Sequence, residues 1–436
     1  MTSTQELPSR VRSLLTARGF ATSAELQQAT GKSQATLSRV LKGMSRDLAV
    51  LGAGKRTRYG LPHTIRGLPA QQPLWWTDEA GLTRRYGTLT FLAGAHVHVS
   101  AEHGLDVTTR DELPWFLAPL RLQGFLGREW AQRLGLDRNP EQWDVEQVLY
   151  AAICIDDHPG AISIGEPQAE MAARHPIPLQ ERGPRYDTLA ADVSSTLPAG
   201  SSAGGEQSKF LAVLGTGEHV LVKFTPPRGT PFGERWHDLL HAEHLALQVL
   251  TEAGFAVAAS RLVETTTRTY LESSRFDRLG ARGRRHAVPL DAVHQAFVPG
   301  PRQTWAATCD ALAAQRRLAT QEAQAVHTLL SFGRLIGNSD MHFGNLSLWA
   351  DAPATERFNL APLYDMLPMR WRPDAFAGLH DYAAFEPVHL AADARATAMA
   401  RDFWARLAEH APASQALRDT AAAMHDRLPR TCRRGA

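Results

Sequence analysis

The stretch GNSDMHFGN, residues 337–345, places an aspartate and an asparagine between two apolar segments. Asp340 and Asn345 have the D-x-x-x-x-N spacing of catalytic loops that transfer phosphoryl groups. This chemistry needs a carboxylate that accepts the proton of the acceptor hydroxyl, and oxygen ligands that hold Mg²⁺ against the phosphates. A later aspartate, Asp365, follows in LAPLYDMLP. We therefore expect Asp340 to be the catalytic base, and Asn345 and Asp365 to be magnesium ligands.

A lysine and a glutamate form a second candidate pair. Lys223 ends the apolar run HVLVKF, and Glu243 lies on the apolar stripe of a helix predicted from about Trp236 to Leu250. A carboxylate on an apolar stripe needs a partner, and a strand lysine held by a helix glutamate orients the phosphates in protein kinases. The alternative, in which Glu243 faces solvent, stays open at this point.

This loop departs from the usual kinase motifs. Asn338-Ser339-Asp340 stands in place of His-Arg-Asp, and Tyr364-Asp365-Met366 stands in place of Asp-Phe-Gly. The motif alone also fits an Asx-rich turn, but a glycine loop, Lys223 and Asp365 follow one another in kinase order. For His342 we favour a role as a hydrogen-bond donor to phosphate, or a structural role, over a role as a metal ligand.

The surrounding elements would position these groups. FLAVL and HVLVKF read as a strand hairpin around Gly-Thr-Gly, preceded by the low-complexity stretch SSTLPAGSSAGG at 194–205. Glycines before a strand let backbone N–H groups approach phosphates. A helix from about Gln321 to Ile336 leads into the loop, and the strands LSLW and FNLAP return Asp365 beside it. The chain after about Pro289 reads as mostly helical.

Composition bounds the class of protein. The 436 residues are 44% hydrophobic and 21% charged, with 47 basic against 45 acidic residues, as in a globular protein with two to four domains. Cys154, Cys309 and Cys432 form no CxxC, which favours a reducing compartment. The start lacks a signal-peptide pattern and no apolar run can span a bilayer, so we expect a cytoplasmic protein without a membrane partner.

The first 65 residues predict a winged helix-turn-helix domain. Two short helices meet at Gly31, and LAVLGAGKRTRYGL reads as two strands around a Gly-Ala-Gly turn. The second helix and the wing would meet DNA, and a docking domain is the alternative. The candidate DNA contacts are Ser33, Gln34, Thr36, Ser38, Arg39, Lys42, Arg56 and Arg58.

Six stretches together resemble the HipA family of bacterial toxin serine/threonine kinases. They are SSAGGEQSKF from Ser201, HVLVKFTPP, AEHLAL, SRFDR from Ser274, IGNSDMHFGN and LAPLYDMLP, in family order. The resemblance implies an α+β fold, a bilobed protein-kinase-like body with a helical C-lobe behind the winged domain. The expected domains are the winged domain (1–65), an N-terminal extension (66–192), the kinase N-lobe (193–285) and the C-lobe (286–436).

The resemblance also implies ATP and Mg²⁺ as cofactors and a role for further residues. Asp340 would be the base, Asn345 and Asp365 would bind magnesium, and Lys223 would bind ATP phosphates. Autophosphorylation would fall on Ser201 or Ser202 and silence the kinase by ejecting the loop. The remaining nucleotide contacts would be Ala203, Gly204, Gly205, Glu206, Gln207 and Ser208 in the phosphate loop, Ser274, Arg275 and Phe276 at the adenine, and His342 and Tyr364 beside the nucleotide.

The expected partners follow from the family. A protein substrate is implied, for which an aminoacyl-tRNA synthetase or another translation component is one choice. Family toxins usually work with a separate DNA-binding antitoxin, whereas here the winged module is fused to the kinase, so DNA and an antitoxin are both candidate partners. Two alternatives remain: a DNA-binding transcriptional regulator with a nucleotide-sensing pseudokinase body, and a small-molecule kinase.

Overall fold

The computed structural model describes most of the 436 residues. The described ranges are 3–52, 54, 57–101, 104–155, 157–166, 175–196, 207–374, 377–387 and 393–429.

The chain folds into two compact units, each described by itself. The first comprises Met1–Asp78, Leu82–Leu122 and Ala131–Met171. The second comprises Glu79–Gly81, Gln123–Trp130 and Ala172–Ala436. The division into four domains expected from the sequence stays a prediction.

The first unit begins with three helices and a small antiparallel sheet of strand order β1-β3-β2. A capping box between Thr22 and Glu25 starts the second helix, and Gly31, at φ 68°, ends it in a left-handed turn. Ser33 then caps the third helix. The elements are α1 (Ser3–Arg18), β1 (Phe20–Thr22), α2 (Ser23–Thr30), α3 (Gln34–Gly43), β2 (Ala49–Leu51) and β3 (Arg58–Gly60).

A five-stranded antiparallel sheet of order β7-β6-β5-β4-β8 forms the rest of the first unit. Its apolar face packs on α5 around Leu89, Phe91 and Leu149. The alternating stretch YGTLTFLAGAHVHVS forms the antiparallel pair β5 and β6. The elements are β4 (Gln71–Thr77), β5 (Thr83–Leu92), β6 (His96–Ala101), β7 (Asp106–Arg110), α5 (Val145–Cys154) and β8 (Ile162–Ile164), and α4 (Gly124–Leu134) is divided between the units.

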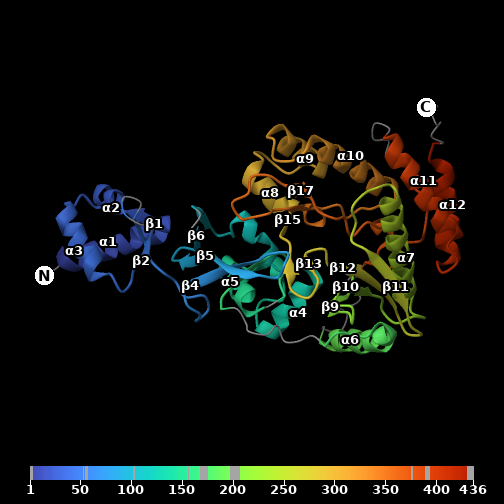
Figure 1. Ribbon diagram of the computed structural model, residues 1–436, viewed down its shortest axis with the longest axis horizontal. Coiled ribbons are helices and arrows are strands. Elements are labelled where there is room, and N and C mark those ends of the chain that lie inside the picture. Colours follow the sequence, from blue (N-terminus) through green and yellow to red (C-terminus); the bar gives the residue numbers. More distant parts are fainter. Residues whose placement is uncertain are drawn as a thin grey trace. The chain divides into compact units, whose positions relative to one another are not determined.

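The second unit contains a four-stranded antiparallel sheet of order β11-β12-β10-β9, with a long helix beside it (Figure 1). The helix begins earlier than the sequence pattern predicts, because Thr230 caps it and Pro231 fits its first position. The elements are α6 (Arg182–Thr196), β9 (Lys209–Val213), β10 (His219–Phe224), α7 (Pro231–Glu252), β11 (Ser260–Glu264) and β12 (Thr269–Ser274).

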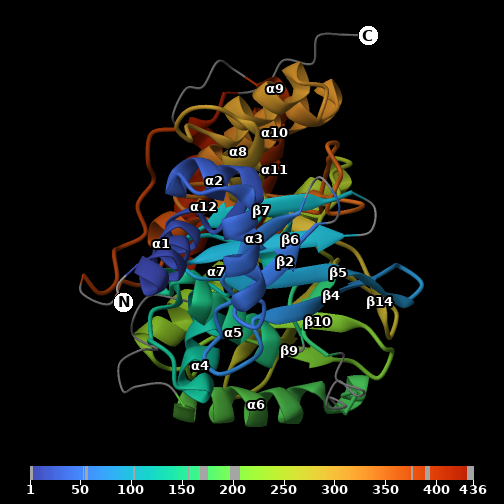
Figure 2. The same ribbon diagram turned by 90° about the vertical axis from the view of Figure 1, so that its left-hand side faces the viewer.

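The two faces of this sheet have different partners because side chains alternate along each strand. Val220 and Val222 of β10 share an apolar core with Tyr186 of α6, which lies along that face (Figure 2). Lys223, the residue after Val222, points to the opposite face and meets Glu243 of α7. The face toward α6 thus combines an apolar core with the buried Glu272, which pairs with Arg182 and Arg261, and the opposite face carries Lys223.

The rest of the second unit is mostly helical, as expected. A three-stranded sheet of order β15-β16-β17 contains the hairpin that brings Asp365 back to the loop. The elements are β13 (Arg278–Leu279), β14 (Gly283–Arg284), β15 (Ala287–Pro289), α8 (Leu290–Phe297), α9 (Trp305–Ala314), α10 (Thr320–Leu335), η6 (Phe343–Asn345), β16 (Ser347–Trp349), β17 (Asn359–Leu360), α11 (Ala394–Glu409) and α12 (Gln415–Arg427). Among the described residues, no helix combines the length and apolar character needed to span a bilayer.

Candidate active site

Lys223 lies at the centre of a buried ionic cluster. Its Nζ donates to Glu243 Oε1 at 2.6 Å and to Oε2 at 2.7 Å, and it also donates to Asp365 Oδ1. The Lys223 and Glu243 side chains are 5% and 1% exposed, whereas Asp365 is 28% exposed. The open question about Glu243 is thus answered: it holds the strand lysine from α7.

The charges of this cluster support one another. Burial opposes the ammonium of Lys223, but the Asp365 and Glu243 carboxylates more than offset it and raise the pKa of the lysine. Burial likewise opposes the Asp365 carboxylate, but Lys223 and then Lys209 hold its pKa below the ordinary value. Both groups are therefore ionised at neutral pH, whereas burial, opposed by Lys223, raises the pKa of Glu243.

The loop after α10 is held together by two asparagine side chains. Asn338 accepts from the backbone N–H of Asp340 at 3.0 Å and donates to the carbonyl of Asp365 at 3.3 Å. Asn345 donates through Nδ2 to the carbonyl of Asp340 at 2.8 Å. These bonds connect Asp340 with Asn345 and, through Asn338, with Asp365. The side-chain oxygen of Asn345, Oδ1, is then the atom that could serve as a ligand.

Asp365 adopts a backbone conformation that few residues accept. Its φ is +54°, in the left-handed region, where Asp and Asn are tolerated better than most side chains. The preceding Tyr364 donates its hydroxyl to the Gly344 carbonyl at 2.8 Å and lies 3.0 Å from Ser347 Oγ. Burial, with the nearby Asp365 charge, raises the pKa of Tyr364 to about 12. The tyrosine thus stays protonated and fixes the strained turn to the catalytic loop.

The expected adenine contacts lie at and just after the end of β12, since Ser274 is its last residue and Arg275 and Phe276 follow. The Phe276 ring packs against Tyr364, with ring centroids 5.8 Å apart, and against Trp349 at 5.5 Å. Ser274 Oγ donates to Glu218, and the Arg275 guanidinium pairs with Asp277 at 2.9 Å. Phe276 is therefore joined directly to the site, whereas Ser274 and Arg275 make their side-chain bonds elsewhere.

His342 begins the short helix η6. Its Nδ1 accepts from the Gly344 N–H at 3.0 Å, and its backbone carbonyl accepts from Trp305 Nε1 at 3.0 Å. The ring itself is exposed. The bond to Gly344 fits the structural role proposed for His342 from the sequence. Because the residue is exposed, its side chain could also bond a phosphate.

Part of the predicted phosphate loop lies outside the described residues, namely Ala203, Gly204, Gly205 and Glu206, together with Ser201 and Ser202. The described end of the loop is anchored to β10. Gln207 Nε2 donates to the Phe224 carbonyl at 2.6 Å, and the Phe224 N–H donates to the Ser208 carbonyl at 2.9 Å. The end of the loop is therefore bonded to Phe224, the residue that follows Lys223 in β10.

Two residues of the site were missed by the sequence analysis. Lys209 pairs with Lys223 across the β9–β10 ladder, so both side chains lie on the same sheet face. Burial lowers the pKa of Lys209, and the charge of Lys223 adds to this while Asp365 opposes it. The alternation of SKF against VLVKF could have revealed Lys209. Asn338 appeared only as a departure from His-Arg-Asp, although it bridges the base and the metal-ligand candidate.

A pocket of about 390 Å³ opens beside the catalytic-base candidate. Asp340 lines it together with Trp305, Arg334 and His342, while Lys223 and Asp365 do not. The pocket is thus distinct from the buried ionic cluster around Lys223.

The candidate DNA contacts of the first unit fall into two groups. Ser33 accepts from the Thr36 N–H at 3.4 Å, and Arg58 pairs with Asp106 and stacks on Phe20 at 4.5 Å. These three side chains thus have partners within the unit. The exposed candidates are Gln34, Ser38, Arg39 and Lys42, and Arg56 lies outside the described residues.

Comparisons with known proteins agree over nearly the whole chain. The model of the HipA-like C-terminal domain matches residues 201–432, and that of the middle domain of YjjJ-like toxins matches residues 68–173. Toxin YjjJ of Escherichia coli (strain K12) is 36% identical over 431 residues, which cover 94% of this chain and 95% of the relative.

One solved structure shows the fold. A chain of the Shewanella oneidensis MR-1 complex of HipA, HipB and operator DNA superposes with a TM-score of 0.54 at 16% identity, covering 83% of this chain and 92% of that one. The Helicobacter pylori proinflammatory kinase CtkA gives a TM-score of 0.34 at 13% identity over 51% of this chain and 90% of its own. The mixed α/β architecture is accordingly shared with the HipA complex. Over these matches the expected resemblance is confirmed, and the chain belongs to the HipA family of toxins.

Proposed function

We propose that the chain is an ATP- and Mg²⁺-dependent kinase that phosphorylates serine or threonine on a protein. The observation that carries this proposal is the position of Lys223, which is buried on a strand and shared between Glu243 and Asp365. An ion pair on a strand and a helix, together with an aspartate after a hairpin, is the arrangement that kinases use to bind phosphates and metal.

The residues fit a nucleotide with magnesium. Asp365 offers a partly exposed carboxylate and Asn345 an amide oxygen, and both are hard oxygen donors of the kind that Mg²⁺ takes. When bound, the ion would neutralise charge on the phosphates. Lys223 and Lys209 on the same sheet face supply positive charge for those phosphates, while Phe276 offers an apolar ring near Tyr364.

Asp340 would act on the acceptor. Its backbone is fixed by Asn338 and Asn345, so its carboxylate has a set position at the wall of the pocket. The acceptor oxygen would attack the terminal phosphorus, the bond to the bridging oxygen would break, and Asp340 would receive the hydroxyl proton. Holding the base in place is what the two asparagines contribute.

The test is the intact mass of the purified chain after incubation with ATP and Mg²⁺. We expect the wild type to gain one phosphate, mapped to Ser201 or Ser202, and Asp340→Asn to gain none while still binding ATP. Loss of the base should slow transfer about 10²–10⁴-fold. Asp351→Asn, which changes an exposed carboxylate after β16, is the matched control. Equal phosphate gain in Asp340→Asn would remove Asp340 as the base.

The N-terminal residues 1–65 supply the second part of the proposal, a winged helix-turn-helix module that binds DNA in the cytoplasm. Its support is the element order α1-β1-α2-α3-β2-β3, with exposed Arg39 and Lys42 on α3. The related solved complex contains HipB and operator DNA, so an antitoxin is a further candidate partner. DNA retention should fall steeply with salt, and Arg39→Ala with Lys42→Ala should weaken it. No retention at low salt would favour a docking module.

A small-molecule acceptor is the second candidate function. The pocket beside Asp340 has the volume of a small-ligand site, which favours this reading over a catalytically silent sensor. A panel of protein, sugar and aminoglycoside acceptors separates the two kinases. Transfer to a protein in the panel supports our first proposal, and transfer to small acceptors alone replaces it.

A further inference from the structure

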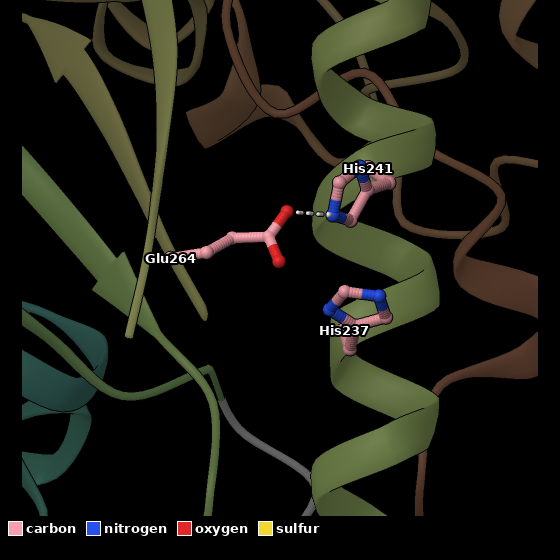
Figure 3. Close-up of side chains that lie close together, drawn as sticks. All are labelled: His237, His241 and Glu264. Atoms are coloured by element: carbon pink, nitrogen blue, oxygen red, sulfur yellow. Dashed lines mark ion pairs between the residues drawn. The ribbon is translucent and has the colours of Figure 1, made fainter. Parts of the chain in front are cut away.

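A second cluster of ionisable side chains lies on α7, apart from the candidate active site. His237 and His241 are one helical turn apart, and Glu264 at the end of β11 faces them (Figure 3). One potential ligand atom from each residue lies within 4.8 Å of the others. Glu243 follows His241 by two residues and so projects from the other side of the helix. The cluster is thus separate from the groups that surround Lys223.

The innermost nitrogen of this cluster has an unmet bonding capacity. His241 is 1% exposed, and its Nε2 makes no hydrogen bond to any described residue, although it lies 3.1 Å from Glu264 Oε1. A buried polar atom without a partner is costly in a protein interior. Histidine binds metals through an unprotonated ring nitrogen, which this position can offer.

Both histidines have a partner for the nitrogen that points away from the cluster. His237 Nε2 lies 3.0 Å from the Pro412 carbonyl, which can only accept, so that nitrogen carries the proton and Nδ1 keeps its lone pair. Nδ1 now accepts from Thr269 Oγ1 at 2.7 Å. His241 Nδ1 lies 2.8 Å from His410 Nε2 and can donate to it. Such outer contacts fix the tautomer and orientation of metal-binding histidines.

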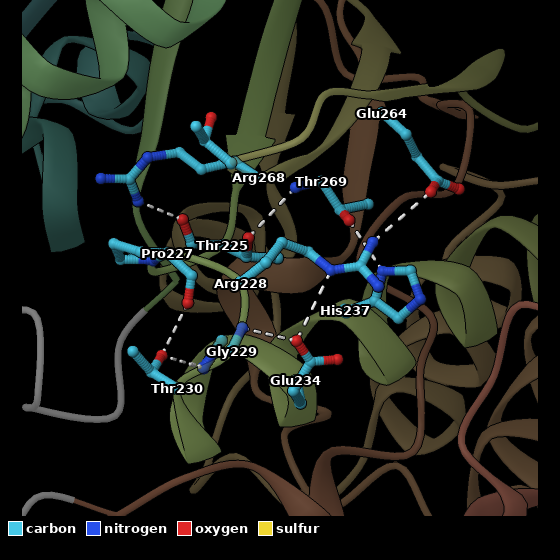
Figure 4. A network of polar contacts seen from close by, with 12 residues as sticks. Thr225, Pro227, Arg228, Gly229, Thr230, Glu234, His237, Glu264, Arg268 and Thr269 are labelled. Atoms are coloured by element: carbon cyan, nitrogen blue, oxygen red, sulfur yellow. Dashed lines mark hydrogen bonds and ion pairs between the residues drawn. The ribbon is translucent and has the colours of Figure 1, made fainter.

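The carboxylate is oriented in the same way. Arg228 Nη1 lies 3.5 Å from Glu264 Oε2, while Arg228 Nε lies 3.5 Å from Glu234 Oε1 (Figure 4). The guanidinium therefore engages the outer oxygen of Glu264 and leaves Oε1 turned toward His241. Arg228 is thus shared between two carboxylates, which reduces the repulsion that a second cation would meet.

We propose that His237 Nδ1, His241 Nε2 and Glu264 Oε1 bind one divalent transition-metal ion, for which zinc is the best match. Two imidazoles and a carboxylate form a common three-ligand set for zinc, whereas magnesium prefers oxygen donors throughout. Zinc ligands lie about 2.0–2.2 Å from the ion, so any of these ligand atoms that lie as much as 4.8 Å apart must approach one another, and the Thr269 hydroxyl must leave His237 Nδ1.

The ion would connect parts of the second unit that are distant in sequence. The ligands come from α7 and β11, and their outer partners, His410 and Pro412, lie between α11 and α12. An occupied site would therefore brace the helix that carries Glu243 against the C-terminal helices. This inference does not rest on kinase activity, because it concerns only metal uptake and stability.

The test uses the full chain without a polyhistidine tag, stripped with chelator and titrated with ZnCl₂ against a chromogenic zinc indicator. We expect the wild type to bind one equivalent that Glu264→Gln and His241→Ala bind at least about tenfold more weakly. Co²⁺ in place of zinc should give the visible absorption of a four-coordinate site in the wild type only. Zinc should also raise the melting temperature of the wild type and not of Glu264→Gln.

Two control variants distinguish zinc bound at this site from zinc bound nonspecifically at other histidines. His244→Ala removes a half-buried imidazole of the same helix that bonds Ser260 at 2.9 Å, and it should bind zinc like the wild type. His327→Ala removes an exposed imidazole paired with Asp310, where ions can bind incidentally, and it too should keep the tight equivalent. The proposal is overturned if the stripped wild type takes up no zinc, or if folded Glu264→Gln binds with wild-type affinity.

Discussion

One helix, α7, serves two clusters of buried ionisable groups that differ in how they are satisfied. Around Glu243 the charges are opposite and in contact, with one lysine between two carboxylates. Around His237 and His241, in what we call the histidine cluster, the imidazoles bond hydroxyl, carbonyl and imidazole partners, and the Glu264 carboxylate lies at the exposed edge. The first cluster is held by charge and the second by hydrogen bonds, so removing one member has different consequences in each.

The largest effect on folding should come from the charged cluster. Lys223→Met leaves Glu243 and Asp365 without their shared cation in a buried site, and unfolding free energy should fall by about 3–5 kcal/mol. Urea unfolding of wild type and variant measures this difference. The loss should be accompanied by loss of ATP binding, since Lys223 is the proposed phosphate contact.

Glu243→Gln is the control for that change. It removes one carboxylate while Asp365 still pairs with Lys223, so it should cost less than Lys223→Met does. A cost for Lys223→Met below that of Glu243→Gln would mean that the lysine is not the centre of the cluster.

A substitution in the histidine cluster should lower the unfolding free energy by less. His237→Leu, measured in chelator, leaves the buried Thr269 hydroxyl and the Pro412 carbonyl without their partner, which should cost about 1–3 kcal/mol. Adding Thr269→Val to His237→Leu should recover part of the loss, because both hydrogen-bonding partners are then apolar. Strictly additive losses in the double variant would show that the two side chains do not interact.

The charged cluster could be predicted from the sequence because the proposed reaction, phosphoryl transfer, calls for these residue types in this order. Lys223, Glu243 and Asp365 each fit a role in that proposed chemistry. Asn338 was hidden because its contribution is a pair of hydrogen bonds across the loop. Lys209 was hidden because its neighbour is set by strand register, which no motif encodes.

The histidine cluster could not be predicted from the sequence. Two histidines four residues apart are common on helices, and Glu264, His410 and Pro412 reach them only through the tertiary fold. The fold itself followed the same division. Strands with a continuous apolar run, such as HVLVKF of β10, were predicted. Helix α6 was missed because RGPRYDTLAADVSST has a weak apolar pattern and its end overlaps the low-complexity stretch.

The smallest effect should come from Glu264→Gln in chelator. Its carboxylate is 43% exposed and its contacts with Arg228 and His241 are partly solvated, so unfolding free energy should change by less than about 1 kcal/mol. Urea unfolding in EDTA measures this, and a larger loss would mean that Glu264 is a structural anchor of β11. Because the metal-free variant keeps its fold, a melting-temperature difference that appears only with zinc must come from the ion. Glu264, the exposed carboxylate of the histidine cluster, is therefore the position at which metal binding and folding can be separated.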